Sequence, residues 1–113
     1  MANIYKIPFE IECFIRKRDI FCVYCGVKMQ NYSESKIRPT IEHIDNDQPW
    51  IWGEGLKLEN IVICCGGCNS SKGAKSLLSW FESAYCIARG ISAATVAEPI
   101  RRHLERISRE VAA

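Results

Sequence analysis

At 113 residues the chain has the length of one domain, and its 48% apolar and 25% charged residues are ordinary for a soluble globular protein. No apolar run approaches the ~20 residues needed to span a bilayer, and the N-terminus lacks the apolar stretch of a secretory signal. The composition therefore argues against membrane and secreted proteins and predicts a cytoplasmic protein with no membrane partner.

The net charge of +2 is unevenly distributed along the chain. Residues 39–63 carry five acidic side chains against one lysine, whereas the segments on either side each carry seven basic side chains against four acidic ones. Such a pattern would suit a divalent cation held beside a polyanion, and an ordinary solvated surface is the alternative.

In chain order, the pattern predicts a helix over residues 8–19 and a short strand over 21–26, followed by a polar loop over 31–38. A strand over 39–44 alternates apolar and polar residues, and a loop over 45–55 leads to a returning strand over 58–64. Asn69 or Ser70 is expected to cap the next helix, with Leu77, Leu78, Phe81 and Tyr85 as its buried stripe.

Beyond Gly90 we expect a C-terminal helical extension over about residues 91–111. Its apolar stripe consists of Val96, Ile100, Leu104, Ile107 and Val111. Because proline cannot continue a helix from the preceding turn, Pro99 predicts a break near Glu98. The sequence thus predicts an α+β fold with an N-terminal helix, a hairpin and C-terminal helices in a single domain over residues 1–113.

Seven cysteines in a chain without a signal peptide argue against a disulfide framework. Four of them form two Cys-x-x-Cys pairs separated by 39 residues, Cys22/Cys25 and Cys65/Cys68. Two such turns supply the four thiolates of a structural zinc, which would clamp the base of the hairpin between them. A redox-active Cys-x-x-Cys pair is the alternative, and Cys64 could replace Cys65 as a ligand. We expect the remaining cysteines to be small buried hydrophobic residues: Cys13, Cys64 and Cys86.

Four polar residues between and after these pairs carry the candidate chemistry. His43 can accept a proton near neutral pH, and the neighbouring Glu42 can ligate a metal if the strand is bulged or ends there. The carbonyl oxygen of Asn69 can ligate a hard cation, and the amide of Asn60 can hold the hairpin loop or orient the imidazole. Taken singly, each has a structural alternative: a buried histidine, a helix cap at Asn69 and a turn residue at Asn60.

In this order the residues resemble the HNH endonucleases, the ββα-metal or His-Me finger nucleases, in their four-cysteine zinc form. The matching segments cover residues 16–83 and consist of Cys22-x-x-Cys25, Glu42-His43-Ile44, Leu58-Glu59-Asn60-Ile61-Val62 and Cys65-x-x-Cys68-Asn69-x-x-Lys72. The resemblance implies a small zinc-stabilised ββα-metal domain that hydrolyses DNA phosphodiester bonds by nicking or double-strand cleavage.

The resemblance also implies a role for each matching residue. His43 would be the general base, Asn60 would position the histidine loop, and Glu42 and Asn69 would hold one catalytic Mg²⁺ or Mn²⁺. The products would carry 5′-phosphate and 3′-hydroxyl ends. The side chains expected at phosphates are Lys72, Lys75 and Arg38.

Two further expectations concern partners. A domain this small offers a limited surface to DNA, so strong sequence specificity would require a homodimer or a larger complex. The alternative function is a catalytically silent zinc module that binds nucleic acid or a partner protein. That alternative needs the cysteines but not Glu42, His43 or Asn69.

Overall fold

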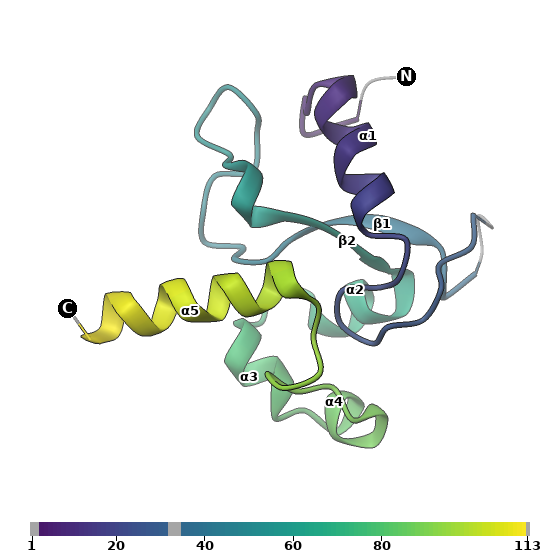
Figure 1. The fold of residues 1–113 in the computed structure, drawn as a ribbon, viewed down its shortest axis with the longest axis vertical. Helices are drawn as coiled ribbons and strands as arrows, with labels where there is room; N and C mark the ends of the chain where they lie inside the picture. The colour runs from purple at the N-terminus through teal and green to yellow at the C-terminus, as the bar shows by residue number, and fades with distance from the viewer. Residues whose placement is uncertain (1–2, 32–34, 113) are drawn as a thin grey trace.

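The structure is a computed structural model, and it describes residues 3–31 and 35–112, without the side chains of the last two of these. Short helices surround one two-stranded antiparallel sheet, so the fold is α+β (Figure 1). The elements are α1 (Phe9–Arg18), β1 (Pro39–His43), the 3-10 turn η1 (Leu58–Asn60), β2 (Ile61–Cys65), α2 (Gly66–Lys72), α3 (Leu77–Phe81), α4 (Ala84–Arg89) and α5 (Glu98–Ala112). None of these helices is long and apolar enough to cross a membrane.

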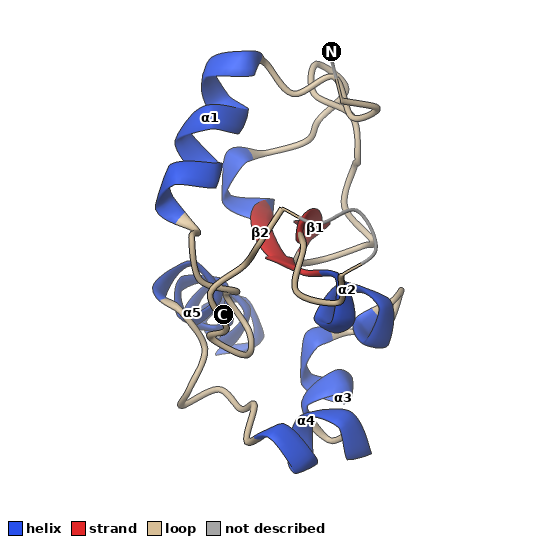
Figure 2. Ribbon diagram, turned by 90° about the vertical axis from the view of Figure 1, so that its right-hand side faces the viewer, coloured by secondary structure: helices blue, strands red, loops and turns tan. Residues whose placement is uncertain are grey.

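The sheet separates two groups of buried residues. β1 and β2 pair without interruption from Pro39 opposite Cys65 to His43 opposite Ile61. Because side chains alternate along a strand, one face carries Thr40, Glu42, Val62 and Cys64, and the other carries Ile41, His43, Ile61 and Ile63. Figure 2 shows α1 on one side of the sheet and α2, α3 and α4 on the other.

The larger core lies on the Glu42 face and joins the cysteine turns to the C-terminal helices. Trp80 and Tyr24 are its largest members, at 0% and 1% exposure, and their rings meet edge to face at 4.9 Å. The smaller core lies on the His43 face, where Ile15 of α1 packs with Ile61 and Ile63 of β2. Both faces of the short sheet are therefore covered.

The prediction of a single helix after the second cysteine pair is wrong, because three short helices occupy this region. α2 begins at Gly66 and ends at Lys72, and the C-cap residue Gly73 has a positive φ of 53°, which glycine adopts readily. Ser76 and Ser83 then cap α3 and α4 by accepting hydrogen bonds from Ser79 N and Cys86 N. The expected stripe is broken accordingly, and Leu78 is 55% exposed.

Other boundaries shift by smaller amounts. The first helix covers residues 9–18, the expected strand over 21–26 is reduced to one bridge between Phe21 and Lys28, and the returning strand is preceded by η1. The C-terminal helix begins at Glu98, which confirms the break expected there.

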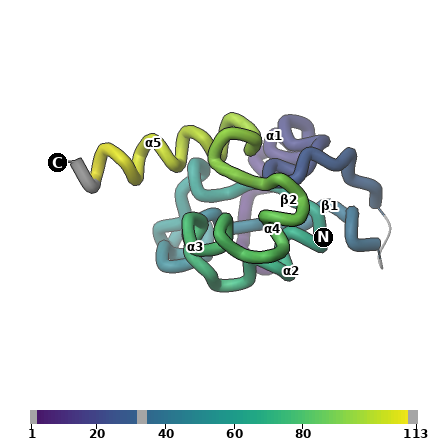
Figure 3. Tube along the Cα trace, turned by 90° about the horizontal axis from the view of Figure 1, so that it is seen from below, coloured from purple at the N-terminus to yellow at the C-terminus, as the bar shows by residue number. Residues whose placement is uncertain are grey.

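α5 extends away from the rest of the fold (Figure 3). Along its expected stripe, Val96 and Ile100 are buried, whereas Leu104 and Ile107 are half-buried. The side chain of Val111 lies outside the described residues.

Candidate metal centre and hairpin site

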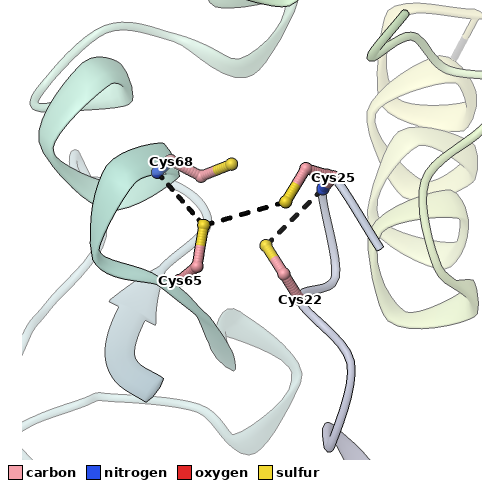
Figure 4. Close-up of side chains that lie close together, drawn as sticks. All are labelled: Cys22, Cys25, Cys65 and Cys68. Atoms are coloured by element: carbon pink, nitrogen blue, oxygen red, sulfur yellow. Dashed lines mark hydrogen bonds between the residues drawn. The ribbon is translucent and has the colours of Figure 1, made fainter. Parts of the chain in front are cut away.

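Four cysteine sulfurs meet where the turn after α1 approaches the end of β2. The Sγ atoms of Cys22, Cys25, Cys65 and Cys68 all lie within 4.8 Å of one another. Figure 4 shows the four side chains converging from two segments of the chain. Cys25 Sγ and Cys65 Sγ are 3.7 Å apart. Sulfurs bound to one tetrahedral zinc lie ~3.8 Å apart, since each Zn–S bond is about 2.3 Å. The four cysteines are therefore positioned to hold a metal ion, consistent with structural zinc.

Each turn directs a backbone N–H group at its own first sulfur. Cys25 N donates to Cys22 Sγ at 3.5 Å, and Cys68 N donates to Cys65 Sγ at 3.4 Å. Hydrogen bonds from the other three thiols lower the pKa of Cys22, whereas hydrogen bonds with Cys22 raise the pKa values of Cys65 and Cys68. Four thiolates this close repel one another, and a divalent cation among them would let all four ionise.

The choice between Cys64 and Cys65 is settled by the alternation of β2. Cys65 points into the cluster, and Cys64 lies beside Thr40, with Sγ 3.7 Å from Oγ1. Burial raises the pKa of the Cys64 thiol, so it remains a neutral, apolar group. Cys64 and Cys86 are buried as expected, while Cys13 is only half-buried.

Glu42 lies in a buried polar network on the same face as Cys64. Its Oε2 accepts a hydrogen bond from the Tyr24 hydroxyl at 3.0 Å and lies 3.2 Å from Lys72 Nζ. Burial raises the pKa of the Glu42 carboxyl, although the Lys72 ammonium and the Tyr24 hydroxyl oppose this shift. Glu42 therefore already has a positive charge beside it.

The resemblance places Lys72 at a phosphate, but in this structure its ammonium is buried beside Glu42. The side chain is 0% exposed, and Nζ also lies 3.5 Å from the carbonyl oxygen of His43. A phosphate contact would require the pair between Lys72 and Glu42 to open.

His43 lies on the opposite face of the strand from Glu42. Its ring stacks on Trp50 at 5.1 Å, meets Tyr5 edge-on at 4.5 Å, and brings Nε2 3.3 Å from the carbonyl oxygen of Trp50. Because a carbonyl only accepts hydrogen bonds, this contact places the imidazole proton on Nε2 and leaves Nδ1 as the acceptor. Burial lowers the pKa of His43 and favours this neutral form.

The two asparagines hold different parts of the hairpin. The Asn60 amide bonds both backbone groups of Asp45, accepting from N at 2.8 Å and donating to O at 3.0 Å. Asn69 lies inside α2 rather than at its start, and its Nδ2 donates to Thr40 Oγ1 at 3.0 Å and to Ile41 O at 3.3 Å. Asn60 thus holds the loop after His43, and Asn69 joins α2 to β1.

The other two residues expected at phosphates lie near the two ends of α2. Arg38 is half-buried, and its guanidinium lies so close to Gly66 that a Cβ there would be 3.2 Å from Nη1. Lys75 is exposed and donates to the carbonyl oxygen of Ser71 at 3.1 Å. Both cations lie beside the cysteine-held helix.

Two of the candidate residues carry oxygen atoms that could bind a second, catalytic cation, but their surroundings only partly suit one. Glu42 and Asn69 carry the oxygen ligands that Mg²⁺ and Mn²⁺ prefer, and Asn69 contacts Thr40, which shares a face of β1 with Glu42. However, Lys72 competes for the carboxylate, and the uninterrupted pairing through His43 puts the imidazole on the other face. A substrate that touches Glu42 and His43 together must therefore do so around the end of β1.

Two contacts escape sequence reasoning. The Tyr24 hydroxyl bonds Glu42, and the Tyr85 hydroxyl donates to Cys68 Sγ at 3.4 Å. The only signal for Tyr24 is its place between the two cysteines of the first pair.

No protein-family model matches this chain, and no curated protein or solved structure matches it either.

Proposed function

We propose that this chain is a zinc-stabilised endonuclease of the HNH type, which hydrolyses DNA phosphodiester bonds with the help of Mg²⁺ or Mn²⁺. The observation that supports this proposal most is the way in which His43 is held. Nε2 lies 3.3 Å from a backbone carbonyl oxygen, which can only accept, so Nε2 carries the proton of a neutral ring and Nδ1 is left to accept one; burial lowers the pKa of His43 and favours that neutral ring. A general base for water needs this protonation state and this fixed orientation.

The order of elements supports the same function. β1, η1, β2 and α2 follow one another in the chain, and His43 ends β1, Asn60 ends η1 and Asn69 lies within α2. Because a metal in the cluster would fix the start of α2 against the sheet, it would also fix Asn69 relative to β1.

Each residue has a distinct task in this proposal. His43 Nδ1 takes the proton of the attacking water, and Asn60 holds the loop that bears the Trp50 carbonyl. Glu42 and Asn69 would hold the divalent ion, which when bound would stabilise negative charge on the phosphate and on the leaving oxygen. Lys75 and Arg38 supply positive charge for neighbouring phosphates.

The test is plasmid nicking by the zinc-loaded protein with added Mg²⁺ or Mn²⁺. We expect His43→Ala to reduce the nicking rate about 100-fold or more, because a general base typically contributes at least that factor. The matched control is His103→Ala, since this second histidine lies on α5 beside Arg106. Cleavage by His43→Ala at the wild-type rate would refute the proposal.

A second function, a zinc module that binds nucleic acid or a protein without cleaving it, is favoured by one observation. Lys72 already neutralises Glu42 in a fully buried pair, and a binding module has no need of a metal there. The same assay separates the two functions. Retention of DNA in a gel-shift experiment, with no nicking by the wild-type protein across several divalent metals, would support the binding module.

A further inference from the structure

The hydroxyl group of Tyr85 connects α4 with the cysteine cluster. Tyr85 belongs to α4, beyond the segment that carries the nuclease-like pattern, yet its hydroxyl donates to Cys68 Sγ at 3.4 Å. α4 thus contributes directly to the surroundings of a candidate metal ligand.

The Tyr85 ring is held from two sides. It stacks on Trp80 with ring centroids 6.0 Å apart, and the guanidinium of Arg89 lies 3.7 Å from its centroid. Ser83 caps the helix that carries it by accepting a hydrogen bond from Cys86 N. The hydroxyl is therefore directed at Cys68 by fixed neighbours rather than by a freely rotating side chain.

The chain leaves room for this hydroxyl at Gly67. A Cβ added to Gly67 would lie only 3.2 Å from the Tyr85 hydroxyl oxygen and 3.4 Å from the backbone oxygen of Lys36. Glycine between the two cysteines of the second pair thus permits the hydroxyl to approach Cys68.

Such a donor has a specific use in a four-thiolate site. Four thiolates around one divalent ion carry a net charge of −2, and hydrogen bonds to sulfur disperse that charge. Backbone N–H groups of the turns reach Cys22 and Cys65. In the part of the chain that the structure describes, the hydrogen bond to Cys68 Sγ from outside the cluster comes from Tyr85.

We propose that Tyr85 is a positioning residue of the metal centre, which donates a hydrogen bond to the metal-bound Cys68 thiolate and slows loss of the metal. Arg89 contributes by holding the ring and by placing a positive charge near the cluster. Helix α4 is then part of the metal site. This role is independent of the proposed nuclease function, because it concerns only the retention of the metal.

The test compares Tyr85→Phe with the wild-type protein, both zinc-loaded. The ring, its stacking and its contact with Arg89 remain in this variant, and only the hydroxyl is lost. We expect zinc transfer to a chelator to become about 10-fold faster, the lower end of the effect of removing such partners. Tyr5→Phe is the matched control, because Tyr5 packs against His43 on the other face of the sheet; its release rate should equal that of the wild type.

Substitution of cobalt for zinc distinguishes a hydrogen bond from general packing. Loss of a donor raises the energy of the sulfur electrons, so the sulfur-to-cobalt charge-transfer band of Tyr85→Phe should move to longer wavelength. An unshifted band in Tyr85→Phe would overturn the proposal, whether the variant releases zinc faster than the wild type or at the same rate. Should Tyr85→Phe fail to retain metal, its band is recorded with cobalt in excess, and an unshifted band under that condition would also overturn the proposal.

Discussion

A buried lysine on α2 faces the carboxylate that the nuclease proposal assigns to a metal. Lys72 and Glu42 have side chains that are 0% and 4% exposed, and Tyr24 donates to the same carboxylate oxygen. A buried charge that loses its partner is not solvated by water. Removal of one member of such a pair therefore destabilises a protein much more than replacement of both members by uncharged residues. The stability of this face of the sheet therefore depends on both charges being present.

Lys72→Met should lower the free energy of unfolding by about 3–5 kcal/mol, because it leaves the Glu42 carboxylate buried without its cation. The measurement is urea denaturation of the zinc-loaded protein at neutral pH. Lys72→Met combined with Glu42→Gln should recover part of this loss, since no unpaired charge remains.

Arg102→Met is the matched control for this experiment. Arg102 pairs with Glu98 at 2.7 Å, but the two side chains are 68% and 63% exposed, so the loss should stay below about 1 kcal/mol. Equal losses in Lys72→Met and Arg102→Met would show that burial of the Lys72 pair carries no energetic weight.

At the level of single residues, spacing predicted the cysteine cluster well. The two-residue interval points to Cys65, and the structure places Cys65 in the group of four sulfurs and Cys64 beside Thr40. The partners Tyr24 and Tyr85 could not be found in this way. Their contacts with Glu42 and Cys68 span 18 and 17 residues and depend on how distant segments pack.

Among the elements, the loop between β1 and η1 is held at its beginning by Asn60. Asn60 bonds Asp45 through both ends of its amide, and its own carbonyl oxygen accepts from Ile44 N at 3.0 Å. This loop carries Trp50, whose carbonyl oxygen lies against His43. The position of the imidazole is therefore linked to a residue on the far side of the loop.

Asn60→Ala should destabilise the protein by about 1–3 kcal/mol and free the start of this loop, because both backbone groups of Asp45 lose their partners. Amide hydrogen exchange of Asp45 should become faster than in the wild type. Asn46→Ala is the control, since Asn46 donates to Gly73 O from an exposed position at 3.1 Å. Unchanged exchange at Asp45 in Asn60→Ala would contradict the holding role.

Elements that local chemistry determines were predicted closely. Alternation after Pro39 gave β1 to within one residue, and Pro99 placed the start of α5. The apolar spacing alone gives the wrong structure for the region after α2, because turn-forming residues interrupt the helix there. Gly73, Ser76 and Ser83 end and restart the helix there, and no single stripe can then face the core.

For the whole molecule, the cysteine cluster joins segments that are distant in the sequence. The first turn bears Val23, whose carbonyl oxygen accepts from Ala97 N at 2.9 Å just before α5 begins. The larger core likewise combines the first turn, β2 and the C-terminal helices, with Trp80 at its centre. A metal in the cluster would therefore stabilise contacts well beyond its ligands.

Removal of the metal by a chelator should lower the melting temperature of the wild-type protein by about 10 °C or more. Binding of a metal to the folded state alone adds stability by mass action, and a loss of about 3 kcal/mol would produce such a shift in a domain of this size. The measurement is thermal unfolding followed by circular dichroism under reducing conditions, with and without chelator, and zinc added back should restore the higher temperature.

Cys65→Ser and Cys64→Ser form a matched pair for this experiment, because the two cysteines are neighbours on β2 and Cys65 belongs to the group of four sulfurs, whereas Cys64 contacts Thr40. Cys65→Ser should melt at the temperature of the chelated protein and no longer respond to chelator, since a ligand is lost. Cys64→Ser buries a hydroxyl in place of a thiol and should melt somewhat lower than the wild type, yet it should keep the full response to chelator. Loss of the response in Cys64→Ser but not in Cys65→Ser would assign the fourth ligand to Cys64. A wild-type melting temperature that does not change with chelator would show that a bound metal does not stabilise the protein.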